Sequence, residues 1–310
     1  KGLTRCAKFI HPFIERIQPK TKNTLQKLIR DWITNREHPE STDKNHISNW
    51  DLCLIEDVDM TSVFNEELRQ LIQEWKATDT HPAPTDTKHI SNWDTSLITD
   101  MSKLFKGYDT FNEDISQWKT SNVKDMSNMF NGALQFNQPI GEWDTSNVKD
   151  MSRMFSTNDP DEGGPEFNQD IGEWDTDNVT NMSFMFCGAY LFNQDIGRWN
   201  TSRVTNMSFM FYDAMEFDQN INKKEVTNNT RTYTAWDTSN VINMEGMFLG
   251  SSFNKPIGNW DTRNVKNMSS MFSNVSNFNQ NISGWNTSNV TNMSYMFNYA
   301  IDFNQDITKW

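Results

Sequence analysis

Most of this chain repeats a single pattern of apolar and polar positions. The stretch Phe192–Phe211, FNQDIGRWNTSRVTNMSFMF, returns with small changes at Phe136–Phe155 and at Phe278–Phe297. In each copy Phe, Ile, Trp, Val, Met, Met and Phe recur at fixed places among Asn, Asp, Ser, Thr and Gly. A period of about 25 residues is typical of a solenoid, in which each coil buries its apolar side against the next coil.

The pattern within one repeat predicts its local structure. The FNQxI segment is short and ends at a turn, which favours a strand. The WDTSN segment that follows is rich in side chains that close turns through local hydrogen bonds. Val148, Met151 and Met154 are three residues apart, which is helical spacing. We therefore expect an α/β repeat solenoid with one short parallel strand and one short α or 3₁₀ helix in each coil.

Two residue types in the repeat invite a functional interpretation, but a structural one fits better. The Asn after each Phe is expected to bond the backbone and its own copies in neighbouring coils. The repeated Trp shares the apolar period, so we place it in the core rather than on a sugar-binding surface. This Trp series comprises Trp93, Trp118, Trp143, Trp174, Trp199, Trp236, Trp260, Trp285 and Trp310.

Residues 1–110 follow a longer period of 43 residues, which separates Trp32 from Trp75 and His46 from His89. Each of these two degenerate units opens with an amphipathic helix, continues through a loop containing Pro, and ends in an imperfect coil. We expect 1–110 to be a helical N-terminal cap and 111–310 to be a solenoid of eight coils. The paired histidines suggest a structural hydrogen bond. We expect residues 7–20 to form a further helix of the cap or an arm to a partner.

Two insertions break the period, Ser156–Glu166 and Asn222–Ala235. In a solenoid such insertions loop out on one face, which is often the functional face. A tolerated surface bulge is the alternative.

The net charge of the chain and the absence of known catalytic and ligand-binding motifs exclude several classes of function. The formal net charge is −13, which argues against nucleic acids and anionic membranes as partners. All five histidines precede residue 90, and no phosphate loop, zinc motif or calcium loop is present. We therefore predict no catalytic, cofactor-binding or metal-binding residues. No apolar run long enough for a transmembrane helix occurs, and no signal peptide is visible in these residues.

Two surfaces are candidates for partner binding. The variable residues before each Ile and each Trp are acidic in the first half of the array, so we predict an acidic strip that meets a basic or polar protein surface. The strip comprises Asp114, Glu142, Asp170, Glu173 and Asp195, and Arg198 lies on the same predicted face. A solvated strip without a partner is the alternative. The second surface is the C-terminal end, where Phe303, Ile307 and Trp310 are expected to be partly exposed. There we expect self-association, a partner cap, or a longer natural chain.

The motif FNQDIxxWDTSNVTNMSxMFxxA resembles the BspA-type leucine-rich-repeat family in its short form. The resemblance covers about Asn45 to Trp310. Such repeats occur in surface lipoproteins of mycoplasmas, in other bacterial surface proteins, and in protists, algae and large DNA viruses. The opening at Asn65–Phe105 is similar to that of algal and viral members. The resemblance implies a right-handed leucine-rich-repeat solenoid without enzymatic activity. It transfers no binding residue, because the family has no shared site.

These observations leave two functions open. One is a protein-interaction or adhesion module of a surface protein. The other is a structural subunit of a larger assembly, such as a virion shell. The expected location is accordingly the cell surface or a virion.

Overall fold

The computed structural model describes residues 22–34, 59–78, 80–86, 88–157, 163–227 and 231–310. The chain divides into two compact units, Lys1–Ile98 and Thr99–Trp310. The sequence pattern placed this division after residue 110. The two units are described separately below.

The first unit contains two helices that contact each other, α1 (Lys22–Thr34) and α2 (Met60–Lys76). Both were predicted from apolar spacing and are confirmed. Their buried faces comprise Leu25, Ile29, Trp32 and Ile33 of α1, and Val63, Phe64, Leu68, Leu71, Ile72 and Trp75 of α2. The Arg30 guanidinium joins them, with Nε 2.6 Å from the buried Glu67 carboxylate and Nη1 2.5 Å from that of Glu74. Their role as a cap for the array stays a prediction.

His89 has the structural role that its position in the sequence suggested. It is 2% exposed and precedes a short 3₁₀ helix, η2 (Ile90–Asn92). Its Nδ1 accepts a hydrogen bond from the Ser91 amide at 3.2 Å. The His89 ring also meets the edge of Trp75, which stacks on His81 with ring centroids 4.0 Å apart. The equivalent His46 lies outside the described residues.

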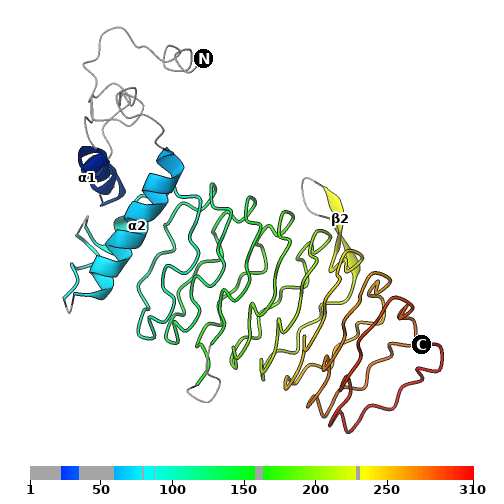
Figure 1. The fold of residues 1–310 in the computed structure, drawn as a ribbon. Helices are drawn as coiled ribbons and strands as arrows, with labels where there is room; N and C mark the ends of the chain where they lie inside the picture. The colour runs from blue at the N-terminus through cyan, green and yellow to red at the C-terminus, as the bar shows by residue number, and fades with distance from the viewer. Residues whose placement is uncertain (1–21, 35–58, 79, 87, 158–162, 228–230) are drawn as a thin grey trace, which may run out of the picture. The chain divides into compact units, whose positions relative to one another are not determined.

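In the second unit, successive repeats lie side by side as a stack of backbone turns (Figure 1). The last Phe of each MSxMF motif forms a column along the stack, with neighbouring ring centroids 5.6–5.7 Å apart. The Phe of each FN motif packs on it within the coil, as in the 3.9 Å contact of Phe130 with Phe136. From Phe105 to Phe278 the rings of both columns are at most 2% exposed. The core is thus a ladder of stacked aromatic rings.

Repeated polar side chains tie each coil to the next, as the sequence predicted. The Asn112 carbonyl oxygen Oδ1 accepts from the Asn137 amide at 3.0 Å and from Gln138 Nε2 at 2.9 Å. The Trp143 indole Nε1 donates to the Ile115 carbonyl of the preceding coil at 3.3 Å. The same bonds recur in most later coils. The Asn and Trp series are therefore structural.

The predicted strand at each FNQxI and helix at each MSxMF are both wrong, because the backbone bonds run elsewhere. At FNQ the next coil is bonded through the Asn side chain instead of a backbone ladder. In MSxMF every second amide donates to the next coil, for example Asn128 to the Ser152 carbonyl at 2.8 Å and Phe130 to Met154 at 2.9 Å. Those amides are not free for helical bonds. The parallel pairing is confined to single bridges at the Asp or Asn before each MS.

The second insertion forms an antiparallel hairpin of β1 (Lys224–Thr227) and β2 (Thr232–Ala235). These are the only strands within the described ranges. The hairpin projects from one side of the stack (Figure 1). Its base remains tied to the array, because the Trp236 amide donates to the Trp199 carbonyl at 2.9 Å.

Candidate functional site

The predicted acidic strip lies on the surface of the second unit. Asp114, Glu142, Asp170, Glu173, Asp195 and Arg198 are all exposed. They precede the buried Ile or Trp of their coils, and this alternation of core and surface positions directs them outward. The stack therefore brings residues from four successive coils onto one face.

The strip aspartates also hold local turns. Oδ1 of Asp170 accepts from the Gly172 amide at 2.9 Å, and Oδ1 of Asp195 accepts from the Gly197 amide at 2.8 Å. An Asn in the same column does the same, as Asn281 shows with the Ser283 amide at 3.0 Å. The negative charge of these residues can therefore be removed while the turn-forming oxygen is kept.

The strip ends at a mixed-charge site formed with the hairpin. Arg198 Nε lies 3.3 Å from the Glu173 carboxylate, and both side chains are exposed. The hairpin contributes Tyr233, whose hydroxyl donates to the Arg198 carbonyl at 2.7 Å. It also contributes Arg231, which pairs with Asp177 and stacks on Tyr233. The insertion therefore folds back onto the coils that carry the acidic strip.

A pocket of about 290 Å³ lies between the hairpin and these coils. Its lining is mostly charged or polar, with Glu173, Asp175 and Asp177 facing Arg198 and Arg231. A smaller pocket of about 220 Å³ lies beside it along the strip, and Glu142, Asp170 and Glu173 line it. Two pockets therefore indent the surface along the acidic strip.

Asp177 is held in its charged form. Burial raises the pKa of its carboxyl, but hydrogen bonds from Arg231 and Asn200 outweigh burial and bring that pKa below its ordinary value. Asn200 Nδ2 donates to Asp177 Oδ1 at 2.8 Å. The ion pair that fastens the hairpin is therefore formed at neutral pH.

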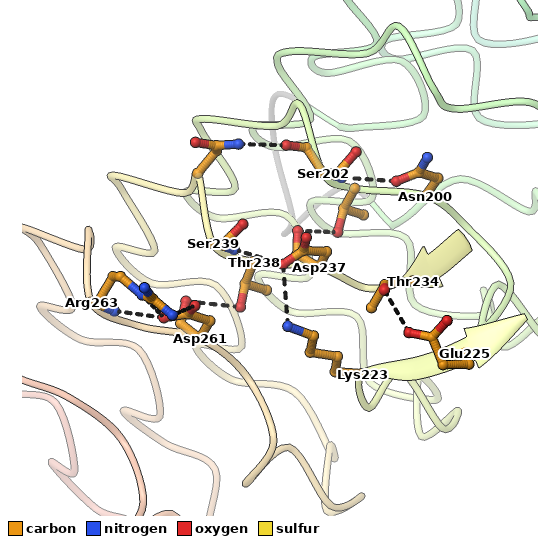
Figure 2. A network of polar contacts seen from close by, with 12 residues as sticks. Asn200, Ser202, Lys223, Glu225, Thr234, Asp237, Thr238, Ser239, Asp261 and Arg263 are labelled. Atoms are coloured by element: carbon orange, nitrogen blue, oxygen red, sulfur yellow. Dashed lines mark hydrogen bonds and ion pairs between the residues drawn. The ribbon is translucent and has the colours of Figure 1, made fainter. Parts of the chain in front are cut away.

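A second polar network lies at the base of the hairpin (Figure 2). Lys223 Nζ lies 3.5 Å from the Asp237 carboxylate, which connects the start of the insertion to the turn after Trp236. In the hairpin itself Thr234 donates to Glu225 at 2.7 Å. Together with the Arg231 pair, these contacts hold the insertion at both its base and its far side.

The predicted C-terminal surface is partly exposed. Phe303, Ile307 and Trp310 are intermediate in exposure, and Ile307 and Trp310 help line a pocket of about 450 Å³. Nearby, Tyr295 is 73% exposed. The Trp310 indole nitrogen is buried and has no hydrogen-bond partner within the described residues.

Within the described residues, Cys187 and the histidines do not gather into a site. Burial raises the pKa of the Cys187 thiol to about 11, so this thiol is protonated at neutral pH. The described residues contain no group of three or more His, Cys, Asp or Glu side chains that could hold a metal ion. Within the same residues, neither helix is long and apolar enough to cross a membrane.

Sequence reasoning missed Asp177, Arg231 and Tyr233 as site residues. The signal available for them was the extra length of the second insertion, which indicated a loop on one face but not where it would fold. Arg231 is far from Asp177 in sequence and meets it only because the hairpin turns back across the coils.

The chain matches the family described as "Mycoplasma protein of unknown function, DUF285". The match covers residues 81–160, 162–235 and 224–310. No curated protein and no solved structure matches the chain.

Proposed function

This chain belongs to the mycoplasma repeat family DUF285, whose function is unknown, and we propose that it is a non-enzymatic protein-interaction module of a surface protein. Its stacked repeats form a right-handed solenoid of the leucine-rich-repeat type. Support for this architecture comes from the aromatic and Asn ladders and from the resemblance to BspA-type repeats.

The observation that carries the proposal is the exposed acidic strip beside the hairpin. Its carboxylates lie at two repeat positions, before the Ile or before the Trp, on four successive coils, and two pockets indent the surface along them. A field of one sign in a groove attracts a partner of the opposite charge and orients it. The partner is therefore a protein with a basic surface. The exposed Arg198–Glu173 pair is weak, so both side chains remain available to that partner.

The test removes charge without breaking the turns. In the strip-neutral variant, the Asn replacements keep the turn-forming oxygen, as Asn281 does naturally. The variant carries Asp114→Asn, Glu142→Gln, Asp170→Asn and Asp195→Asn. We expect a labelled ten-residue polylysine peptide to bind about tenfold more weakly, with a smaller dependence on salt, because surface charges act through screened attraction. Fluorescence anisotropy at low and high salt measures both effects.

A matched control removes the same number of negative charges elsewhere on the chain. It carries Asp31→Asn, Glu66→Gln, Glu216→Gln and Asp302→Asn, at four exposed residues outside the strip positions. Its affinity should stay close to that of the natural chain. Equal weakening in both variants would mean that only net charge matters, and the strip would then not be the binding surface.

A further inference from the structure

One position in the repeat has a left-handed backbone in all eight coils of the second unit. It is the middle residue of MSxMF, with φ between 53° and 61°. Its occupants are Lys103, Asn128, Arg153, Phe184, Phe209, Gly246, Ser270 and Tyr295. Gly and Asn suit this conformation, whereas a bulky side chain is an outlier there. The adjacent coils carrying Phe184 and Phe209 therefore use a residue type that the backbone disfavours.

These two rings are not part of the buried ladder. Both are partly exposed, whereas the neighbouring Phe186 and Phe211 are fully buried. Phe184 and Phe209 stack with centroids 4.8 Å apart, and the Arg153 guanidinium lies 3.8 Å over Phe184. Beyond them the Phe209 ring lies against Gly246, where an added Cβ would be 2.4 Å from Cε1 of that ring. A side chain at Gly246 would therefore displace the ring.

Arg153, Phe184, Phe209 and Tyr212 together form what we call the aromatic platform. Tyr212 joins it through an edge contact with Phe209, at 6.1 Å between centroids. Asn128 shows that the column does not require an aromatic residue for folding. The left-handed backbone is common to all eight coils, but a bulky side chain on it is not. A bulky residue kept in a disfavoured conformation is a physical basis for inferring function. Partly exposed aromatic and Arg side chains are the types enriched where proteins bind each other.

The charge beside the platform differs from that of the acidic strip. Lys103 lies in the same column, and Lys124 and Lys149 occupy the exposed position before the bridging Asp of their coils. Those aspartates are half-buried, and each closes a local turn, as Asp150 does with the Ser152 amide at 2.8 Å. The half-buried Asp213 is the acidic residue next to Tyr212. The lysines thus make the flank on the side of Arg153 basic in an otherwise acidic chain.

We propose that the aromatic platform is a second binding surface, which takes a protein segment with aromatic or apolar side chains beside acidic residues. The rings of Phe184 and Phe209 receive the apolar side chains. Arg153 and the neighbouring lysines pair with the carboxylates. This surface lies on the MSxMF side of each coil, whereas the acidic strip lies on the FNQxI side, so the two act independently.

The experiment uses the full chain and two labelled peptides of equal length. One alternates Phe with Glu, and the other alternates Phe with Lys. We expect the Phe–Glu peptide to bind the natural chain, and the variant F184N/F209N to bind it at least about tenfold more weakly, since central aromatic residues dominate such contacts. Tyr295→Asn changes the same column at a distant coil and should leave the affinity unchanged. The strip-neutral variant should also bind the Phe–Glu peptide normally.

Circular dichroism and thermal unfolding establish whether the variant is folded. We expect F184N/F209N to keep the native spectrum, because Asn128 occupies the same backbone conformation. Unfolding of this variant would place both rings in the core and overturn the proposal. So would equal binding of the Phe–Glu peptide by the natural chain and F184N/F209N. An equal fold loss of affinity for both peptides in F184N/F209N would also overturn it, because the acidic strip is expected to bind the Phe–Lys peptide without the platform.

Discussion

At the scale of the residue, one amide side chain replaces a backbone ladder between coils. Asn193 Oδ1 accepts from the Asp218 amide at 3.1 Å and from Gln219 Nε2 at 2.9 Å. Asp218 does the same for the Asn254 amide at 2.8 Å, so the required group is the oxygen and not the amide nitrogen.

We predict that Asn193→Ala lowers the free energy of unfolding by about 1–3 kcal/mol, because it leaves part-buried donors unsatisfied. Asn193→Asp keeps the oxygen and should cost much less. Urea unfolding followed by tryptophan fluorescence measures both. Equal losses in the two variants would show that the oxygen is not what holds the coils together.

Cys187 yields a prediction about pH. Burial raises the pKa of its thiol to about 11, above the ordinary value of 9.0. In a chain with Cys6 and Cys53 changed to Ser, we expect very slow alkylation of Cys187 at pH 8 and a rise in rate as pH approaches 11. Because the folded pKa is raised, this thiol favours the folded state below its ordinary pKa, and the benefit is lost as pH rises through 11. Alkylation of Cys187 in the folded chain at pH 8 as fast as in urea would contradict this prediction.

At the scale of the element, the hairpin β1–β2 depends on contacts with coils that precede it. The Tyr233 hydroxyl and Arg231 bond Arg198 and Asp177, respectively. Removing the charge of Asp177 should loosen the far side of the hairpin while the base, fastened by Lys223 and Asp237, remains in place.

We predict that Asp177→Asn increases amide hydrogen exchange in residues 223–227 and 231–236 by about two- to fivefold, since a part-exposed ion pair contributes at most about 1 kcal/mol. Because the folded pKa of Asp177 is lowered, the contribution is present at neutral pH and is lost as pH falls through that pKa. Lys255→Met breaks an ion pair with Asp218 elsewhere and should leave the hairpin unaffected. If Lys255→Met increased hydrogen exchange in the hairpin by the same factor, the Asp177–Arg231 ion pair would not be what holds the hairpin in place.

At the scale of the whole molecule, stability in the second unit is distributed along the stack. Each ring contacts rings of adjacent coils, as Phe192 does with Phe167 and Phe217 at 6.3 and 6.0 Å between centroids. In such arrays stability is roughly a sum of repeat terms and nearest-neighbour terms. A central core residue should therefore matter more than a half-buried one in the last coil.

We predict that Phe192→Ala costs about 3–5 kcal/mol, because the ring is fully buried between two neighbours. Phe303→Ala should cost clearly less, since Phe303 is only half-buried. Equilibrium urea unfolding compares the two. If both variants lost the same stability, the array would unfold as one unit without regard to position.

The sequence by itself determined the repeat, its core residues and the two N-terminal helices. Each coil packs mainly against its neighbours along the chain. The periodic spacing of apolar residues is therefore enough to predict which residues are buried. The sequence also predicted correctly that Asn112 and its copies bond across coils. The exposure of the acidic residues is seen in the structure, and their binding role stays a prediction. The sequence did not determine which backbone segment would carry the ladder, because short apolar runs at MSxMF suit a helix or a bonded turn equally well.

Only the tertiary structure decided how distant segments meet. Arg231 pairs with Asp177 because the insertion folds back across earlier coils. The contacts that direct this folding join residues far apart in sequence, so no local sequence pattern predicts them. Likewise, the sequence does not show that Phe184 and Phe209 stack on each other at the surface. The structure shows it, because both residues have the left-handed backbone of their repeat position and their rings lie side by side. Core positions follow from periodicity, whereas a surface site depends on which variable side chains the stacking brings together.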